Sequence, residues 1–341
     1  MKVTIKDVAE LAGVSFKTVS RVVNDEVGVK SSMREKVQSA IKQLNYQPNL
    51  TARRLRGKSS IIGFIYNNPN SNYVITMLHG ILATARENSY ELVVHPCDTT
   101  SDAKQIVEEI LALISRSMLS GLVLTPPISE NPTIIKMLDD AGVKFSRIVS
   151  GSKPPKDVER TIYIDDRKAA YQITEHLIRQ NHSRICFLNG DPEHLSSGER
   201  LEGYKAALVD NGIAVSPELI LEGHYSFESG MARAQKLMAL ATMPTAVFAC
   251  NDEIAAGALF AARMQGIKVP DQLSVVGFED SPFSRQTWPS LTTAKQPNDK
   301  IAGHATEILI HMLESDADKP TDFLSHGYLP EILVRESSAS I

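Results

Sequence analysis

Long uncharged hydrophobic runs and paired cysteines are both missing from this sequence of 341 residues. No 18 consecutive residues are all apolar and uncharged, so we expect no helix that crosses a membrane. The first residues, MKVTIKDVAELAG, contain no apolar run of signal-peptide length, which favours a cytosolic protein. The three cysteines, Cys97, Cys186 and Cys250, form no C-x-x-C pair, so we expect buried free thiols in a reducing compartment.

Sequence motifs of catalysis are missing as well. The chain has no G-x-G-x-x-G, H-E-x-x-H or G-x-S-x-G, and its nine histidines show no metal-ligand spacing. Gly57-Lys58-Ser59 imitates the end of a phosphate-binding loop, but Ala52 stands where that loop requires a glycine. His176 and His182 flank a predicted helix end, which favours a charged or capping role. We therefore expect neither an enzyme nor a metal or cofactor site.

What is present is the composition of a globular chain with an uneven charge. Apolar residues make up 43% and charged residues 22%, and the length suits two or three domains. The net charge of −4 by itself argues against a nucleic-acid partner. Residues 1–58, however, hold 12 Lys and Arg against 5 Asp and Glu (net +7), and residues 59–341 hold 24 against 35 (net −11). A basic head joined to an acidic body indicates that the head contacts nucleic acid or an anionic membrane.

The basic head shows three helical patterns with the spacing of a helix-turn-helix. Thr4 and Asp7 have capping-box spacing before an apolar pattern that ends at Ala12, and Gly13 supplies a tight turn. Ser15 caps a second helix, whose inward residues are Val19, Val22 and Val23. Its other face carries side chains that can read base edges in a major groove: Phe16, Lys17, Thr18, Ser20, Arg21 and Asn24. A third helix is capped at Ser32 and turns four residues inward: Val37, Ala40, Ile41 and Leu44. The alternative is a three-helix module with a solvated basic face.

Two segments of the head, TIKDVAELAGVSFKTVSRVVND and REKVQSAIKQLNYQPNLTARRLRGK, resemble the lactose/galactose repressor family of bacterial transcription regulators. The resemblance covers nearly the whole chain. It implies a small all-α helix-turn-helix head over residues 1–46, a hinge helix or linker over 47–59, and an effector-binding and dimerisation domain over 60–341. That domain is expected to be a two-lobed α/β domain like periplasmic binding proteins of type I, with parallel sheets. We also expect Thr4 and Ser15 to contact the DNA.

The segment that follows Pro48 is long enough for only two helical turns, which are marginal alone in water. In the resembled family this segment is a hinge helix that orders in the minor groove beside the hinge of a second subunit. Leu55 stands where the family has a leucine that wedges open the central base step. The residues of this segment expected at the DNA are Asn49, Ala52, Arg53, Leu55 and Arg56. A cleavable basic linker is the alternative.

The body alternates apolar runs with amphipathic stretches, which predicts parallel α/β architecture. The runs are residues 61–66, 92–95, 122–124, 145–149, 162–164, 185–188, 246–249 and 273–278. So many parallel strands favour two sheets with a ligand cleft between them. From the resemblance we expect three crossings between lobes, near Tyr163–Asp166, Leu291–Thr293 and Thr321–Leu324. One lobe then holds residues 60–163 and 292–321, and the other holds 164–291 and 322–341.

Ligand-binding side chains are expected at the carboxyl ends of the strands. The amide-rich run that includes Asn68 and ends at Tyr73 follows the first strand; a turn-rich loop is the alternative. Arg200 occupies the position of the family's effector-binding arginine, and its planar fork suits vicinal hydroxyls or a carboxylate. A surface ion pair with Glu199 or Glu202 is the alternative for Arg200.

The other pocket candidates rest mainly on the resemblance. Asn251 aligns with an effector contact, and the neighbouring Asp252 is expected to cap a helix. Glu279 replaces the family's usual aspartate and reaches further, which implies a different or smaller ligand. Tyr225 and Phe227 both fall near the family's aromatic platform, and either could supply it. Arg147 is a further candidate because it is expected at the end of a strand of the first lobe. The two aromatics have ordinary core packing as their alternative. His194 stands near the second arginine of purine-binding relatives, which weakens a purine effector.

We therefore expect a sequence-specific transcription regulator that binds double-stranded palindromic operator DNA as a homodimer. The expected role is a repressor of carbohydrate genes that a sugar effector releases from DNA. A corepressor-dependent repressor or an activator with a non-sugar effector remains an alternative. A sugar-binding transport protein is opposed by the basic head. No leucine heptads follow Val334, so we expect a dimer and not a tetramer.

Overall fold

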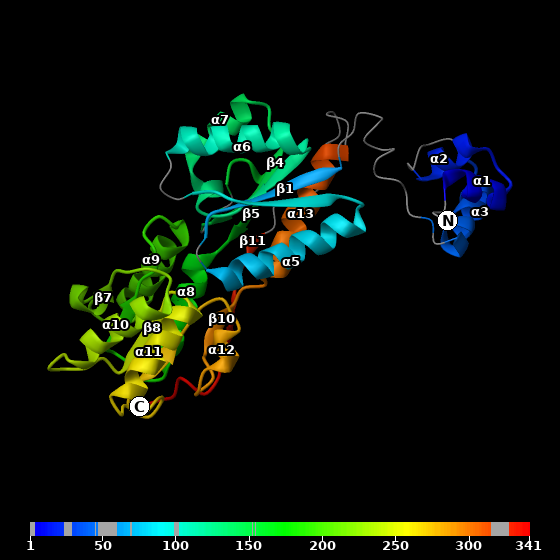
Figure 1. Ribbon diagram of the computed structural model, residues 1–341. Helices are drawn as coiled ribbons and strands as arrows, with labels where there is room; N and C mark the ends of the chain where they lie inside the picture. Colours follow the sequence, from blue (N-terminus) through cyan, green and yellow to red (C-terminus); the bar gives the residue numbers. More distant parts are fainter. Residues whose placement is uncertain are drawn as a thin grey trace. The chain divides into compact units, whose positions relative to one another are not determined.

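Figure 1 shows the computed structural model of the chain, which describes residues 4–23, 29–44, 46, 60–68, 70–98, 102–151, 153, 155–314 and 327–341. The chain divides into two compact units, residues 1–60 and 61–341. In the described ranges, no helix has both the length and the apolar character that a membrane span requires.

The first unit contains three helices, α1 (Ile5–Ala12), α2 (Phe16–Val23) and α3 (Ser31–Leu44). The Asp7 carboxylate accepts hydrogen bonds from the Thr4 backbone N–H at 2.7 Å and the Thr4 hydroxyl at 2.8 Å. Gly13 has φ +64°, and Ser15 Oγ accepts from the Thr18 N–H at 3.1 Å. The core of this unit forms where the helices meet and contains Val8, Val19 and Val37. The helix-turn-helix prediction is confirmed.

The start predicted for the third helix at Ser32 is wrong. This helix begins at Ser31, and the carbonyl of Lys30 accepts from the N–H groups of Met33 and Arg34. Ser32 therefore lies within the first turn.

The first lobe of the second unit is a six-stranded parallel sheet in the order β11-β5-β4-β3-β1-β2. Its strands are β1 (Ile61–Tyr66), β2 (Glu91–Pro96), β3 (Gly121–Leu124), β4 (Phe145–Ser150), β5 (Thr161–Ile164) and β11 (Gly327–Tyr328). Helices α5 (Ser71–Glu87) and α13 (Asn298–Glu314) cover one face, and α6 (Ala103–Ser117) and α7 (Pro132–Asp140) cover the other (Figure 1). Side chains alternate between these two faces of a strand, so each face has its own apolar core.

The second lobe is a four-stranded parallel sheet in the order β7-β6-β8-β9. Its strands are β6 (Ile185–Leu188), β7 (Ile220–Leu221), β8 (Ala246–Ala249) and β9 (Ser274–Val276). Its helices are α8 (Asp166–Arg179), α9 (Leu195–Asp210), α10 (Phe227–Met238), α11 (Asp252–Met264) and α12 (Phe283–Gln286). Helix α8 packs against α9, and α10 packs against α11. An apolar core joins the sheet to α8, α9, α10 and α11.

The chain crosses between the lobes three times. It leaves the first lobe between β5 and α8 and returns through β10 (Thr293–Lys295) into α13. The third crossing was expected near Thr321–Leu324, in a segment that lies outside the described residues. Gly327 and Tyr328 still pair with β5, so the crossing follows Tyr328, through β12 (Glu331–Leu333), which pairs antiparallel with β10. The expected start of the last second-lobe segment at residue 322 is therefore wrong.

Most other predictions for the body agree with the structure. All eight apolar runs contain strands, which separate into two sheets as expected. The three cysteines are buried and free. His182 is buried and lies within hydrogen-bonding distance of Thr245 Oγ1 (3.0 Å) and Ser274 Oγ (3.1 Å). Burial lowers the pKa of His182, so it packs as an uncharged core residue and not as a charged group at a helix end.

Candidate functional site

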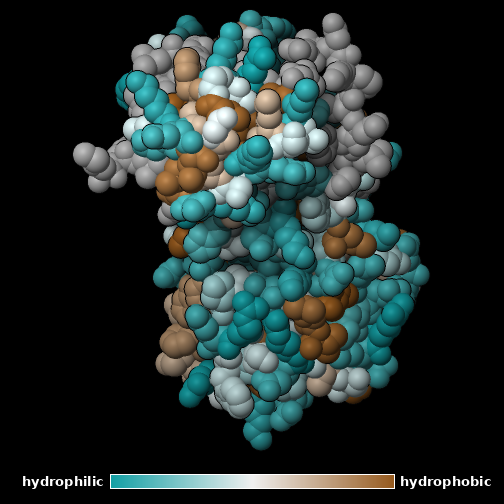
Figure 2. All heavy atoms as spheres, turned by 90° about the vertical axis from the view of Figure 1, so that its right-hand side faces the viewer, coloured by the Kyte–Doolittle hydropathy of each residue, from teal (hydrophilic) through white to brown (hydrophobic). Residues whose placement is uncertain are grey.

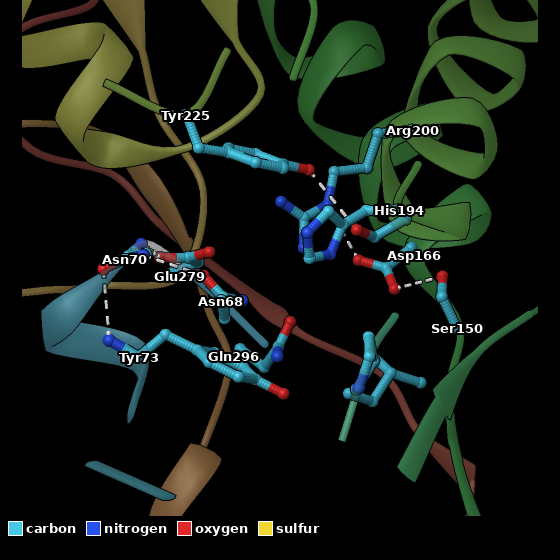
Figure 3. Close-up of a pocket in the computed structure, with 13 residues that line it drawn as sticks. Asn68, Asn70, Tyr73, Ser150, Asp166, His194, Arg200, Tyr225, Glu279 and Gln296 are labelled. Carbon is cyan, nitrogen blue, oxygen red and sulfur yellow. Dashed lines mark hydrogen bonds and ion pairs between the residues drawn. The ribbon is translucent and has the colours of Figure 1, made fainter. Parts of the chain in front are cut away.

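A polar cavity lies between the two lobes at the carboxyl ends of their strands. The first lobe contributes Asn68, Asn70, Tyr73, Pro126, Ser150 and Ile164. The second lobe and the crossing strand contribute Asp166, His194, Ser196, Arg200, Tyr225, Glu279 and Gln296. Figure 3 shows the labelled side chains of both lobes pointing toward one another across this pocket.

A buried ion pair forms one wall of the pocket. Arg200, on α9, donates from Nε to Oδ1 of Asp166 at 2.8 Å and from Nη1 to the carbonyl oxygen of Cys250 at 2.6 Å. Its guanidinium lies 3.7 Å from the ring centroid of Phe278, a cation–π contact. Ser150, from the first lobe, donates to the other Asp166 oxygen at 2.5 Å. The described residues provide no acceptor for Arg200 Nη2, which leaves this group for a ligand.

Glu279 forms the opposite wall. Its backbone has φ +102°, a conformation that non-glycine residues rarely adopt and that often marks functional sites. Glu279 Oε2 accepts a hydrogen bond from Asn70 Nδ2 of the first lobe at 3.2 Å. Burial raises the pKa of Glu279 to about 8, although the positive charge of Arg200 opposes this. At pH 7 this side chain is therefore mostly protonated and can both donate to and accept from a hydroxyl group.

Aromatic rings and an amide complete the pocket. Tyr225 is buried and its hydroxyl lies 2.9 Å from Ser197 Oγ, while Tyr73 lies on the other side of the cavity (Figure 3). Burial lowers the pKa of His194, so this ring adds no positive charge at pH 7. Gln296 donates from Nε2 to Asn298 at 2.7 Å, but its buried Oε1 has no hydrogen-bond partner among the described residues. A ligand hydroxyl would satisfy this acceptor, which is costly to leave unpaired.

Comparison with known proteins gives consistent matches over both units. Residues 4–49 match bacterial regulatory proteins of the lacI family, and residues 174–338 match a periplasmic binding protein-like domain. The chain is 30% identical to the HTH-type transcriptional repressor PurR of Vibrio campbellii over 335 residues, which cover 98% of each chain. It is 31% identical to the HTH-type transcriptional regulator DegA of Bacillus subtilis over 301 residues, 87% of each chain. The chain belongs to the lacI family of bacterial regulatory proteins.

Solved structures of lacI-type regulators share the fold. The lac repressor dimer bound to operator and the anti-inducer ONPF matches with a TM-score of 0.74 and 28% identity, over 100% of each chain. A complex of the transcriptional regulator CelR with cellobiose matches with a TM-score of 0.70 and 27% identity, over 98% of this chain and 100% of that one. The two-lobed body and the helical head expected from the sequence are thus those of this family.

Five of the eight predicted effector-binding residues line the pocket of this lacI-family chain: Asn68, Tyr73, Arg200, Tyr225 and Glu279. Arg200 does not pair with Glu199, which instead binds Arg167 at 2.9 Å, nor with Glu202, which binds Lys205 at 2.9 Å. The surface ion pair considered for Arg200 is therefore excluded.

Three predicted effector-binding residues do not line the pocket: Arg147, Phe227 and Asn251. Arg147 lies within β4 and not at its end, and it donates to Asp157 and to the carbonyl of Ser129. Phe227 begins α10 and contacts the Phe260 ring, with centroids 5.6 Å apart.

Asn251 has the capping role that the sequence suggested for Asp252, and the effector contact predicted for Asn251 is not seen in the pocket wall. Asn251 is the N-cap of α11 and accepts from the Ile254 N–H at 2.9 Å, and its Nδ2 has no partner among the described residues. Asp252 does not cap the helix. It is buried and accepts from Thr293 Oγ1 at 2.6 Å and the Ser281 N–H at 2.7 Å. Neither residue lines the pocket.

Sequence reasoning missed several pocket residues that strand ends could have indicated. Ser150 ends β4, Pro126 follows β3, and Asp166 follows β5. Asn70 caps α5 by accepting from the Tyr73 N–H at 3.2 Å, and its amide nitrogen reaches Glu279. Gln296 follows the crossing strand β10, which has no counterpart among the predicted strands. The strand-end rule, applied to the residues that end β3, β4 and β5 or lie within two positions after them, would have found the first three.

The predicted DNA-reading face of the head is largely exposed. Phe16 is 60% exposed, although it is apolar, and Lys17 and Arg21 are exposed beside it. Thr4 and Ser15 are exposed and Thr18 is half-buried. Ser20 was predicted to contact DNA from the exposed face of α2, but its side chain is buried, with an exposed fraction of only 9%. Six predicted DNA contacts lie outside the described residues: Asn24, Asn49, Ala52, Arg53, Leu55 and Arg56.

One group of possible metal ligands occurs among the described residues, away from the pocket wall. His95 Nε2 lies 2.6 Å from Glu109 Oε1, and the Cys97 thiol completes a group whose ligand atoms all lie within 4.8 Å of one another. Burial raises the pKa of Cys97 to about 12, so its thiol is neutral at pH 7. None of the three lines the pocket.

Proposed function

We propose that this protein represses carbohydrate-utilisation genes by binding a palindromic operator as a homodimer, and that a sugar effector releases it from DNA. The pocket between the lobes carries this proposal. It combines the unused Nη2 of Arg200, the mostly protonated Glu279 and the unpaired acceptor of Gln296. These groups can donate hydrogen bonds to, and accept them from, the hydroxyl groups of a sugar. Arg200 is the one permanent cation among the three.

The DNA-binding part of the proposal rests on the head. Its net charge of +7 suits phosphates, and the exposed residues of α2 suit base edges in a major groove. Leu55 and the rest of the hinge segment are proposed to act in the minor groove. Operator DNA lies in the cytosol, and the protein is proposed to act there.

An apolar surface on the second lobe supports the homodimer. In Figure 2, hydrophobic side chains form patches on the lower lobe within a largely hydrophilic surface. Trp288 is 79% exposed and Met264 is 67% exposed, and Trp288 shares a surface groove with Phe260. Exposed apolar patches of this kind mark interaction sites. A twofold dimer would present two heads, which requires an operator with two half-sites.

Hydrogen bonds between the lobes suggest how an effector changes DNA affinity. Asn70 to Glu279 and Ser150 to Asp166 both join one lobe to the other at the pocket. A ligand that binds these side chains competes with the bonds and favours one lobe arrangement over another. Only this difference in affinity between arrangements can couple the effector to the DNA.

The test is operator binding measured by fluorescence anisotropy with the full chain and a duplex selected by the protein from a random library. We expect a two-half-site sequence, a steep loss of affinity with salt, and release by at least one sugar. A flat salt dependence would contradict phosphate-dominated binding. A ligand that tightens DNA binding would instead show a corepressor-dependent regulator.

A further inference from the structure

The edge strand β2 of the first lobe brings a histidine and a cysteine to the same face of the sheet. Alternate residues of a strand face one side, so Val93, His95 and Cys97 share a face at the end of β2. Val93 and Cys97 belong to the apolar core that α6 covers, whereas Leu92 belongs to the core on the opposite face. The Cys97 backbone N–H donates to the carbonyl oxygen of Tyr66, at the end of β1, at 2.8 Å. The imidazole and the thiol therefore both face α6 from a fixed stretch of backbone.

Helix α6 adds a carboxylate to these two groups. Its first turn is fixed by a capping box, in which the Gln105 N–H donates to Asp102 at 2.8 Å and the Asp102 N–H donates to Gln105 at 3.1 Å. One turn later, Glu109 Oε1 lies 2.6 Å from His95 Nε2. The ligand atoms of His95, Cys97 and Glu109 all lie within 4.8 Å of one another. A nitrogen, a sulfur and an oxygen donor thus converge on one point.

The separations are close to those around a tetrahedral metal ion. With Zn–S bonds of about 2.3 Å and Zn–N and Zn–O bonds of about 2.0 Å, tetrahedral ligand atoms lie about 3.3–3.6 Å apart. The contact between His95 and Glu109 would have to widen by about 1 Å, and the thiol would have to approach them by at most about 1.5 Å. Rotation of the His95 and Glu109 side chains, which are 19% and 40% exposed, can supply these shifts without a change in the backbone. The exposure of Glu109 also leaves room for a water molecule as the fourth ligand.

The donor types select zinc among the common divalent ions. Sulfur and imidazole ligands suit Zn²⁺, whereas Mg²⁺ and Ca²⁺ take six or more oxygen ligands. When the ion binds, the Cys97 thiol releases its proton to solvent and its sulfur coordinates as a thiolate. The thiolate and the Glu109 carboxylate then supply two negative charges, and the neutral His95 imidazole adds none. A dication is thereby neutralised, which a partly buried position requires.

We propose that His95, Cys97 and Glu109 bind one zinc ion, with water as the fourth ligand, and that the ion links the edge strand β2 to α6. The sequence predicted no metal site, because spacing along the chain was the criterion and the third ligand comes from the helix after the strand. None of the three residues lines the effector pocket, so the failure of this site would leave the proposed function unaffected. The alternative is a hydrogen-bonded histidine and glutamate that bind no ion.

The test is a titration of the untagged full chain, freed of metal by a chelator, with Co²⁺ as the spectroscopic substitute for Zn²⁺. Tetrahedral cobalt bound to a thiolate has a sulfur-to-metal charge-transfer band in the near ultraviolet and intense visible bands. Cys97→Ala removes the sulfur ligand, and Cys186→Ala is the matched control because Cys186 is also a buried free thiol. Glu109→Gln and its neighbour Glu108→Gln form a second pair, since Glu108 is 65% exposed and lies outside the ligand group.

We expect one Co²⁺ per chain with the charge-transfer band, displaced by Zn²⁺ and not by Mg²⁺. The band should be lost in Cys97→Ala and kept in Cys186→Ala. Glu109→Gln should keep the band but bind zinc at least tenfold more weakly, and Glu108→Gln should bind it like the wild type. Zinc should raise the melting temperature of the wild type and not that of Cys97→Ala, because an ion that binds only the folded state stabilises it.

Three results would each overturn the site. These are a wild-type chain without the charge-transfer band, a band that survives in Cys97→Ala, and a Glu109→Gln variant that binds zinc like the wild type. Circular dichroism in the presence of chelator verifies that each variant is folded. If Cys97→Ala does not fold, the wild-type spectrum and the two glutamate variants decide the question, because Glu108 and Glu109 are both partly or largely exposed.

Discussion

Arg200 and Asp166 form an ion pair in which both side chains are almost completely buried, with exposed fractions of 4% and 2%. Two consecutive helices of the second lobe supply them, since Asp166 begins α8 and Arg200 lies on α9. Burial disfavours the Arg200 charge, but Asp166 and the other acidic groups around Arg200 together more than compensate, so the pKa of Arg200 is raised. Arg200 therefore keeps its charge and has a fixed orientation before any ligand binds.

This pair makes Arg200 a structural residue as well as a candidate ligand contact. Arg200→Met leaves the Asp166 carboxylate buried without a counter-charge, which should lower the free energy of unfolding by about 3–5 kcal/mol. Adding Asp166→Asn should recover part of this loss, because no buried charge remains. Urea denaturation measures both. Arg285→Met is the control, since Arg285 is 57% exposed in its ion pair with Asp280 and should cost about 1 kcal/mol or less. An equal loss in both single variants would contradict a buried, unscreened pair.

Glu279 should make the protein less stable as the pH rises. Burial raises its pKa from 4.5 to about 8, so between these values the folded state binds more protons than the unfolded state. Its contribution to stability is complete below pH 4.5 and is lost as the pH rises through 8. Glu279→Gln should make the decline of unfolding free energy between pH 5 and 8 shallower, by roughly 1 kcal/mol per pH unit.

Urea titrations at several pH values test this, with Glu336→Gln as the control. The pKa of Glu336 is lowered by hydrogen bonds from Ser290, so its titration falls below this window. Identical slopes in the wild-type protein and Glu279→Gln would show that Glu279 is ionised throughout.

Phe16 should contribute to DNA binding and not to folding. Its side chain is 60% exposed on α2, so Phe16→Ala should change the unfolding free energy by only about 0.5 kcal/mol. Operator affinity should fall roughly tenfold, or about 1.4 kcal/mol. Met33→Ala on α3 is the control, because Met33 is also exposed, at 42%, and is not a predicted DNA contact. If both variants bind the operator like the wild type, α2 does not read bases through Phe16.

The apolar surface of the second lobe should hold the dimer together. Trp288→Glu places a charge on this surface, where Trp288 is 79% exposed and lines both grooves, so the fold should tolerate it while the dimer dissociates. Sedimentation velocity should show a monomer at concentrations where the wild type is a dimer. Val209→Glu is the control because Val209, 63% exposed on α9, does not line the grooves around Trp288. A dimeric Trp288→Glu variant would place the interface elsewhere.

The sequence predicted the elements of this fold well because their signals are local. The capping residues Thr4 and Ser15 and the turn at Gly13 determine the head from contacts within a few residues. Except for the run in the edge strand β2, where Val94 is 41% exposed, the apolar runs of the body are largely buried in parallel sheets, whose strands are apolar on both faces. Strand β11 was missed because it has only two residues and is defined by pairing with β5, more than 160 positions earlier.

The pocket was less predictable because it depends on side-chain direction and on contacts between the lobes. Arg147 was assigned to the cleft, but it lies three positions before the end of β4 and points toward Asp157. Ser150, at that strand end, is the pocket residue. The bond from Asn70 to Glu279 joins residues 209 positions apart, and no spacing rule relates them.

Release of the full chain from its selected two-half-site operator by a sugar tests the central claim most directly. Fluorescence anisotropy would follow the labelled duplex as the sugar is added, at fixed salt and pH. We expect at least a tenfold loss of operator affinity with an effective sugar, and a much smaller loss in Glu279→Ala, in which the wall opposite Arg200 is removed. Operator affinity that no sugar alters, or a Glu279→Ala variant that responds like the wild type, would contradict the account.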